Sequence, residues 1–338
     1  MLLAIGVVIG CTLSKGKPPA RQISSAQLLA KNLGNRGFVD DPMDIACADV
    51  HELQHTFGAQ ASHDQPRWWV AAAAQLVPQL SELLRTPLGQ PDQSTSPAAM
   101  RQRTLSEFAS KSDAKRLQDL FNRHGSDKST PRHNYHLVYA EILNRLGQDR
   151  PLRTLEIGLG TNNSNLASNM NYLGTRHRVG ASLRSFRDFL PRSAVFGADV
   201  DERILFAEER IRTAAVDQMS RASFSKLFTA FGALPFDLII DDGLHAVGSS
   251  MNTLLFALSA ANVHSPRGAY IVVEDIHSRQ LPVFELISWI LGQRVAVHEG
   301  SAYRCVTESF AVKVSAQKGG LYIYVLHLKR VRKAAESK

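Results

Sequence analysis

A chain of 338 residues with 44 % hydrophobic and 21 % charged residues has the ordinary balance of a globular protein, and its length allows one large domain with an extension. The net charge of +8 favours acidic partners, although part of the excess lies in residues 329–338. Cys11, Cys47 and Cys305 are too few and too far apart for a disulfide framework or a CxxC metal site, so a reducing compartment is expected.

The N-terminal segment is apolar but short. Residues 2–13 read LLAIGVVIGCTL, which is too short a run to span a bilayer as a helix. No positively charged region precedes Leu2, as a secretory signal requires, although Val8–Cys11 resembles a lipoprotein cleavage box. Membrane attachment through residues 1–13 therefore stays open, but a cytoplasmic protein is the favoured interpretation.

The first hundred residues differ in composition from the rest. Gly, Pro, Ser and Gln are frequent after residue 14, and a helical period over 68–84 is interrupted by Pro78. We divide the chain into a partly helical or disordered extension over 1–100 with a linker at 86–98, a catalytic domain over 101–330 and a basic tail over 331–338.

The extension contains a possible zinc motif. Residues 51–55 read HELQH, the pattern of a zinc peptidase helix. The extended form of that motif needs a third histidine at a position that Ala61 occupies. Two histidines on one surface of a helix are the plainer interpretation, and a zinc metallopeptidase is kept as an alternative function.

From residue 101 the pattern predicts alternating helices and strands. Helices are expected at 104–122, 135–147, 164–173, 201–211, 221–231, 247–261 and 281–292. Short apolar strands are expected at 154–157, 195–198, 213–216, 236–240 and 270–273. Such alternation predicts a parallel sheet covered on both faces. Residues 310–314 and 321–328 flank a Gly-Gly turn and predict a closing antiparallel hairpin.

The first of these strands runs into a turn that contains glycines. Gly158 and Gly160 follow Glu156, and glycines at a strand end let the backbone approach a ligand closely. A dinucleotide fold would place a glycine where Asn163 stands. The segment instead resembles the first motif of methyltransferases that use S-adenosylmethionine, whose amino and sulfonium groups suit a nearby carboxylate.

Acids and histidines follow two later strands. Asp241, Asp242 and His245 follow the fourth strand, and Glu274 and Asp275 end the fifth. Because ligands of open α/β sheets bind at the carboxyl ends of the strands, these side chains should meet at one edge. Mg²⁺ or another divalent cation would compensate the acids and polarise a hydroxyl, while His245 accepts its proton. The simpler alternative is that Asp242 and His245 cap the following helix.

Three motifs resemble the metal-dependent sugar O-methyltransferases of macrolide pathways, of the macrocin and mycinamicin type. They are IDDGLH at 240–245, VVEDI at 272–276 and GSDKSTPRHNYHLVYAEIL at 125–143. This resemblance implies the Rossmann-like class I methyltransferase fold, a mostly parallel seven-stranded sheet with a C-terminal antiparallel hairpin and helices on both faces. It also implies S-adenosyl-L-methionine and a divalent cation, Mg²⁺ or another, as cofactors.

The same resemblance assigns roles to residues. Asp242 and Asp275 would hold the metal, and His245 would be the general base. Asp199, at the tip of the second strand, would accept the ribose hydroxyls. The implied cofactor contacts are Glu156, Gly158, Gly160, Asp199, Asp217, Gln218 and Asp241. A lid-like pattern is matched by Lys128, His133, Tyr135 and Tyr139.

The acceptor is not readable from the sequence. A hydroxyl of a glycan, of a glycosylated natural product or of a small phenol would suit this chemistry. Nucleic acid is not expected, because no Asn-Pro-Pro-Tyr type motif occurs. The oligomeric state stays open, with a homo-oligomer as one option. A methyltransferase fold that binds without catalysis is a further alternative, which the complete set of acids and histidine disfavours.

Overall fold

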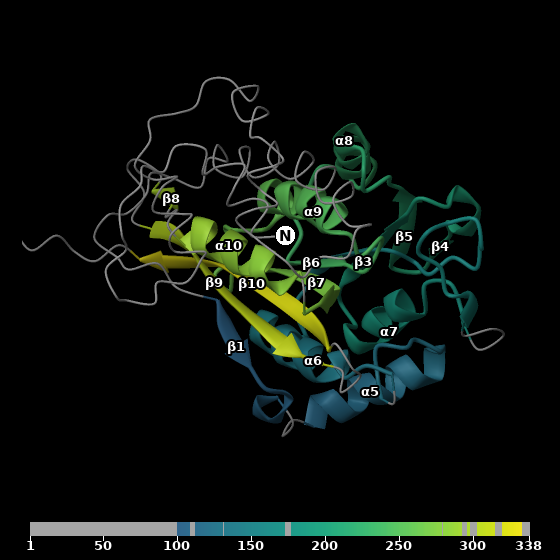
Figure 1. Cartoon of the computed structure of the whole chain (residues 1–338), viewed down its shortest axis with the longest axis horizontal. Coiled ribbons are helices and arrows are strands. Elements are labelled where there is room, and N and C mark those ends of the chain that lie inside the picture. Colours follow the sequence, from purple (N-terminus) through teal and green to yellow (C-terminus); the bar gives the residue numbers. More distant parts are fainter. Residues whose placement is uncertain are drawn as a thin grey trace, which may run out of the picture.

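A computed structural model describes residues 100–108, 112–130, 132–172, 177–278, 280–292, 296–297, 303–314 and 320–332 (Figure 1). The apolar segment 2–13, the HELQH motif at 51–55, the linker at 86–98 and residues 333–338 lie outside the described residues. Among the described residues, no helix combines the length and the apolar character that crossing a membrane would require.

One sheet organises the described part of the chain. Its strands, in spatial order, are β1 (Arg101–Arg103), β9 (Tyr303–Lys313), β10 (Leu321–Arg332), β7 (Ala269–His277), β6 (Leu238–Asp241), β2 (Arg153–Ile157), β3 (Ala194–Asp199), β5 (Ile211–Ala215) and β4 (Ala207–Glu208), and β8 (Ala296–Val297) pairs with β9. The strands from β7 to β5 are parallel to one another, whereas β10 runs antiparallel to both β7 and β9. The expected mostly parallel sheet with an antiparallel C-terminal hairpin is confirmed, but the short strands β1, β4 and β8 bring it to ten strands instead of the expected seven.

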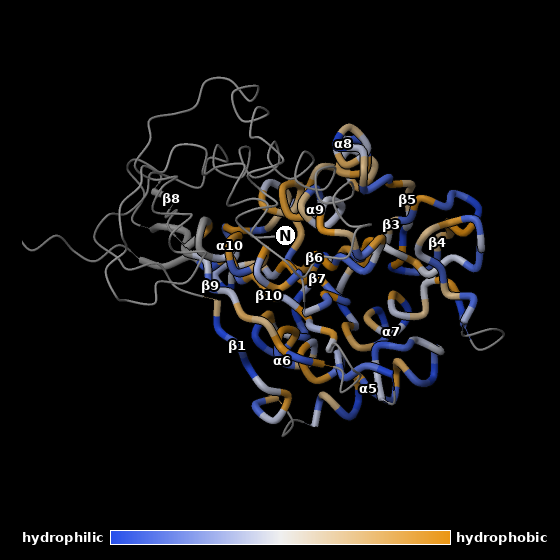
Figure 2. Tube along the Cα trace, in the orientation of Figure 1, coloured by the Kyte–Doolittle hydropathy of each residue, from blue (hydrophilic) through white to orange (hydrophobic). Residues whose placement is uncertain are grey.

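Helices cover both faces of this sheet (Figure 1). One layer holds α5 (Ser112–His124), α6 (Tyr135–Leu146) and α7 (Ala181–Phe189), and the other holds α8 (Arg221–Ala230), α9 (Val247–Ala260) and α10 (Leu281–Gly292). Alternate strand residues point to opposite layers, so Leu238 and Ile240 pack with the first set and Ile239 with the second. This two-sided burial explains the continuous apolar strands at the centre of the molecule (Figure 2).

Two predicted helices are wrong. Residues 164–172 form turns and a short 3-10 segment, and residues 201–208 form a 3-10 helix (Glu202–Ile204) and β4. In the first case the side chain of Asn163 accepts the Asn165 N–H at 3.2 Å, a local bond that competes with helix formation. In the second, the Thr213 hydroxyl bonds both the N–H and the carbonyl of Phe206, which holds that backbone against β5.

Other boundaries shift. The helix expected at 104–122 is a 3-10 helix (Leu105–Glu107) and then α5, and α7 was not predicted. β10 continues through Arg332, two residues into the segment expected as a basic tail. β1 pairs in parallel with β9, so the residues directly before the first helices belong to the sheet.

Candidate active site

The carboxyl edge of the sheet collects the predicted site residues. Backbone pairing places Ile157 of β2 opposite Asp241 of β6, and Asp241 opposite Val273 of β7. The Asp242 N–H then donates to the Ile157 carbonyl at 2.8 Å, which fixes the start of the loop after β6. Short parallel strands therefore deliver acids from distant parts of the sequence to one edge.

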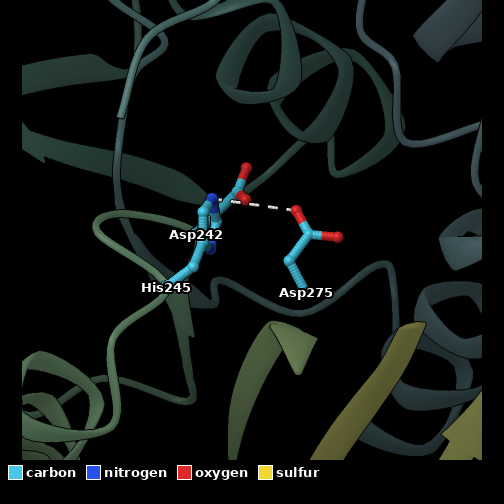
Figure 3. A group of neighbouring side chains, drawn as sticks. All are labelled: Asp242, His245 and Asp275. Carbon is cyan, nitrogen blue, oxygen red and sulfur yellow. Dashed lines mark ion pairs between the residues drawn. The ribbon is translucent and has the colours of Figure 1, made fainter. Parts of the chain in front are cut away.

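Asp242, His245 and Asp275 form one group at this edge. One potential ligand atom from each lies within 4.8 Å of the others, and His245 Nε2 is 3.8 Å from Asp275 Oδ2 (Figure 3). All three side chains are partly exposed, so the group is open to a small ligand. His245 and Asp275 have φ values of +55° and +54°, a left-handed conformation that is unfavourable for residues with a Cβ and that often marks functional sites.

Neither Asp242 nor His245 is the N-cap residue of the next helix. α9 begins at Val247, and its N-cap residue is Ala246, which has no capping side chain. The Asp242 carboxylate is instead bound by Lys128, and His245 approaches Asp275. The capping alternative is therefore not supported.

A buried lysine compensates the acids. The Lys128 ammonium lies 2.5 Å from Asp242 Oδ2, 2.6 Å from Glu274 Oε2 and 3.2 Å from Glu156 Oε1. Its side chain is only 2 % exposed. Burial disfavours this charge, but the charges of Asp242 and Glu274 outweigh burial and hold the Lys128 pKa well above its usual value. The sequence marked Lys128 only as part of a lid-like pattern, and its partners were not foreseen.

Two tyrosines of the same segment bind the acids of β7. The Tyr135 hydroxyl donates to Asp275 Oδ1 at 2.5 Å, and the Tyr139 hydroxyl donates to Glu274 Oε1. His133 stacks on Tyr135 with ring centroids 4.8 Å apart. Burial, followed by the charge of Asp242, raises the pKa of Glu274 well above its usual value. Residues 128–139 therefore form a second layer of contacts behind the open group.

The glycine turn after β2 leaves no room for side chains. Gly158 has φ +101°, and a Cβ there would lie 2.0 Å from the Asp242 carbonyl oxygen. Gly160 has φ +78°, and a Cβ there would lie 2.6 Å from the His177 ring. The glycine turn and the loop that carries Asp242 are thus in direct contact.

Asp199 and Glu156 lie on either side of this turn. Asp199 Oδ2 accepts the Leu159 N–H at 2.8 Å, which ties the tip of β3 to the turn. Glu156 Oε1 accepts the Ser182 hydroxyl at 2.8 Å, whereas its Oε2 is buried and has no hydrogen-bond partner. Burial raises the pKa of Glu156 to about 6. An unpartnered buried carboxylate oxygen beside an open turn fits a cationic ligand group.

The loops after β5 and β6 are joined by Gln218. Its amide donates to Asp241 Oδ1 at 2.7 Å, and its Oε1 accepts the Leu244 N–H at 2.8 Å. Asp217 is exposed and accepts the Met219 N–H at 2.9 Å, a local turn contact. Gln218 and Asp241 are both buried, so neither side chain lies at the surface.

Two exposed apolar side chains were missed by the sequence analysis. Val200 and Met219 are 53 % and 45 % exposed, directly after Asp199 and Gln218. They follow neighbouring strands, β3 and β5, whose last residues Asp199 and Ala215 are paired. In the sequence, Val200 directly follows the acid that ends β3, whereas Met219 lies four residues after the end of β5.

Comparison with known proteins gives a consistent picture, although no family model matches the chain. The chain is 32 % identical over 176 residues to 8-demethyl-8-alpha-L-rhamnosyl tetracenomycin-C 2'-O-methyltransferase of Streptomyces olivaceus, covering 51 % of this chain and 41 % of the relative. It is 31 % identical over 139 residues to mycinamicin VI 2''-O-methyltransferase of Micromonospora griseorubida, covering 40 % and 30 %. L-olivosyl-oleandolide 3-O-methyltransferase of Streptomyces antibioticus matches at 28 % over 274 residues, covering 74 % and 66 %.

A solved structure also matches. It is the MycE methyltransferase from the mycinamycin biosynthetic pathway in complex with Mg, SAH and mycinamycin VI, at 26 % identity and a TM-score of 0.40, covering 52 % of this chain and 40 % of that one. The expected similarity to sugar O-methyltransferases of the macrocin and mycinamicin type is confirmed. The chain spans about two fifths of the length of the first of these relatives.

Proposed function

We propose that this chain transfers a methyl group from S-adenosyl-L-methionine to a hydroxyl of a sugar or glycoside, with the help of a divalent cation. The observation that carries the proposal is the open group of Asp242, His245 and Asp275, which adjoins the glycine turn at the carboxyl edge of the sheet. The relatives named above are O-methyltransferases that act on glycosylated natural products. The acceptor is thus a small molecule or glycan rather than a nucleic acid.

The cofactor would lie over the ends of β2, β3 and β5. Gly158 and Gly160 are partly exposed, and the unpartnered Glu156 Oε2 suits the amino group of the methyl donor. Asp199 would accept the ribose hydroxyls through its remaining lone pairs. Val200 and Met219 would cover the adenine, with Asp217 at the rim, while Asp241 and Gln218 support the pocket from behind.

The metal would bind at Asp242 and Asp275. Carboxylate oxygens suit Mg²⁺, which keeps several waters and leaves room for an acceptor hydroxyl. A bound divalent cation supplies Lewis acidity, which lowers the pKa of a hydroxyl that it contacts. The partial exposure of both carboxylates fits such an open site.

His245 would accept the acceptor's proton at Nε2. The pKa of an aliphatic hydroxyl lies roughly nine units above that of a free imidazole, a gap of about 12 kcal/mol, so a histidine alone cannot hold an alkoxide. Asp275 Oδ2, 3.8 Å from Nε2, stabilises the imidazolium that forms. Bound S-adenosyl-L-methionine would supply the methyl group to the acceptor oxygen, with the electron pair of the broken carbon–sulfur bond remaining on sulfur.

The test is a labelled methyl donor with a panel of glycosides, glycans and phenols, with and without a chelator. We expect transfer to sugar hydroxyls that stops in chelator and returns with Mg²⁺. Calorimetry with S-adenosylhomocysteine runs in parallel, since the fold should bind it without any acceptor. Full activity in chelator, or an active Asp242→Ala enzyme, would show that the metal-assisted scheme is wrong. Binding of S-adenosylhomocysteine without transfer to any acceptor would favour the binding-module alternative.

A further inference from the structure

Lys128 connects three strands through one buried ammonium. Its partners are Glu156 in β2, Asp242 just after β6 and Glu274 in β7. Glu156 and Glu274 are as buried as the lysine, so water does not replace these contacts. Leaving one member without its partner would bury an uncompensated charge, which is strongly unfavourable.

Asp242 belongs to two groups at once. Its Oδ2 is held by Lys128, while its carboxylate also belongs to the open group with His245 and Asp275. Glu274, although adjacent to Asp275 in the sequence, accepts hydrogen bonds from Lys128 and Tyr139. The ammonium therefore lies at the boundary between an inner, lysine-bound set of acids and an outer set that is open to a ligand.

We propose that Lys128 is a positioning residue for the divalent cation. It fixes the orientation of Asp242 for metal binding and holds Glu156 and Glu274 out of the metal's coordination shell. The inference rests on the proposed function, because it requires that a metal binds Asp242 and Asp275.

Two effects of removing the ammonium have opposite signs. Loss of a positive charge near the site should strengthen cation binding. Loss of the hydrogen bond that orients Asp242 should weaken it, and changes in such supporting contacts typically cost roughly 10–100-fold in metal affinity. Because loss of the positive charge alone would strengthen Mn²⁺ binding, weaker binding without the ammonium must come from the lost hydrogen bond. The direction of the change in affinity therefore separates the two effects.

The experiment measures Mn²⁺ binding to the full chain by calorimetry and by the EPR signal of free Mn²⁺. Lys128→Met removes the ammonium and keeps a long side chain. We expect it to weaken Mn²⁺ binding by roughly 10–100-fold. Lys115→Met is the matched control, because it makes the same substitution at an exposed ammonium that pairs with Asp119, and its Mn²⁺ affinity should equal that of the wild type.

A second pair of variants guards against misfolding of Lys128→Met. Glu274→Gln and the double variant Lys128→Met/Glu274→Gln differ only in the ammonium, and the double variant has no uncompensated charge at position 274. The double variant should bind Mn²⁺ more weakly than Glu274→Gln, by a similar factor. Equal or tighter binding in the variants that lack Lys128 would overturn the proposal. A wild-type chain that binds S-adenosylhomocysteine but no Mn²⁺ would overturn the metal-assisted scheme itself, a result distinct from failure of the lysine's role alone.

Discussion

The Tyr135 hydroxyl donates to Asp275 Oδ1 at 2.5 Å and also accepts the Asp275 N–H at 3.3 Å, across 140 residues of sequence. One side chain thus holds both the carboxylate and the backbone of a residue whose φ is +54°. The left-handed backbone of Asp275 is unfavourable on its own, so this contact stabilises the conformation that presents the carboxylate to His245.

Tyr135→Phe should weaken Mn²⁺ binding by roughly 10–100-fold, because Asp275 loses the hydrogen bond that orients it. Calorimetry on the folded variant measures this. Tyr172→Phe is the control, since its hydroxyl donates to Asp127 and not to the open group, and it should leave the Mn²⁺ affinity unchanged. Equal affinities in both variants would mean that Asp275 is held by other contacts.

His245→Ala should lower turnover by roughly 10²–10⁴-fold, the effect of losing a general base. Binding of S-adenosylhomocysteine and of Mn²⁺ should persist, since Asp242 and Asp275 remain. His277→Ala, an exposed histidine at the same edge, should keep full activity. Loss of Mn²⁺ binding in His245→Ala would identify His245 as a metal ligand instead of the base.

Asp199→Asn should weaken binding of S-adenosylhomocysteine by about 1.5–3 kcal/mol, the contribution of hydrogen bonds to a charged group. Asp199 accepts the N–H groups of Leu159 and Asp201 on its two oxygens, and the Asn amide can keep only one of these bonds, so the melting temperature of the variant is measured first to check that it is folded. Calorimetry gives the affinity, and Glu209→Ala in the exposed turn before β5 serves as the control. Unchanged affinity in Asp199→Asn would place the ribose elsewhere.

Gly158→Ala and Gly232→Ala form a matched pair. Both glycines have positive φ, +101° and +86°, so each substitution should cost about 1–2 kcal/mol of stability for the backbone alone. Only the Cβ at position 158 meets an atom, the Asp242 carbonyl oxygen, whereas nothing lies within 4 Å at position 232. Gly158→Ala should therefore unfold at a lower temperature than Gly232→Ala and lose both cofactor and Mn²⁺ binding. Equal melting temperatures of the two variants would show that the Asp242 carbonyl can move away from the added Cβ.

His136 should make the stability of the protein depend on pH. Burial lowers the pKa of its imidazole to about 4, so the neutral form is favoured in the folded state. The contribution of neutral His136 to the free energy of unfolding is complete above the pKa of histidine in the unfolded chain, about 6.5. It is lost as the pH falls towards 4. Urea unfolding at several pH values should show a smaller loss of stability for His136→Gln than for the wild type over this range. If the free energy of unfolding fell equally in both proteins over this pH range, groups other than His136 would cause the acid sensitivity.

The strands could be predicted because buried parallel strands are short apolar runs, as in Leu238–Asp241. The two wrong helices depend on side chain to backbone bonds of Asn163 and Thr213, which hydrophobic periodicity does not register. The positions of Asp242, His245 and Asp275 after or at the ends of neighbouring strands also predicted that they would lie close together. The contacts of Lys128 could not be predicted, because nothing near it in the sequence identifies partners that lie on three separate strands.

The separation between Lys128 and its partners has a consequence for the order of folding. Asp242 and Glu274 are 114 and 146 residues away along the chain, so none of these contacts can form locally. If β2, β6 and β7 closed first, the dry interior would hold several carboxylates with no cation among them. We therefore expect the segment before α6 to dock before these acids lose their water. The sheet edge would then become fully desolvated only after Lys128 is in place. Lys128 is also synthesised before all three of its acidic partners.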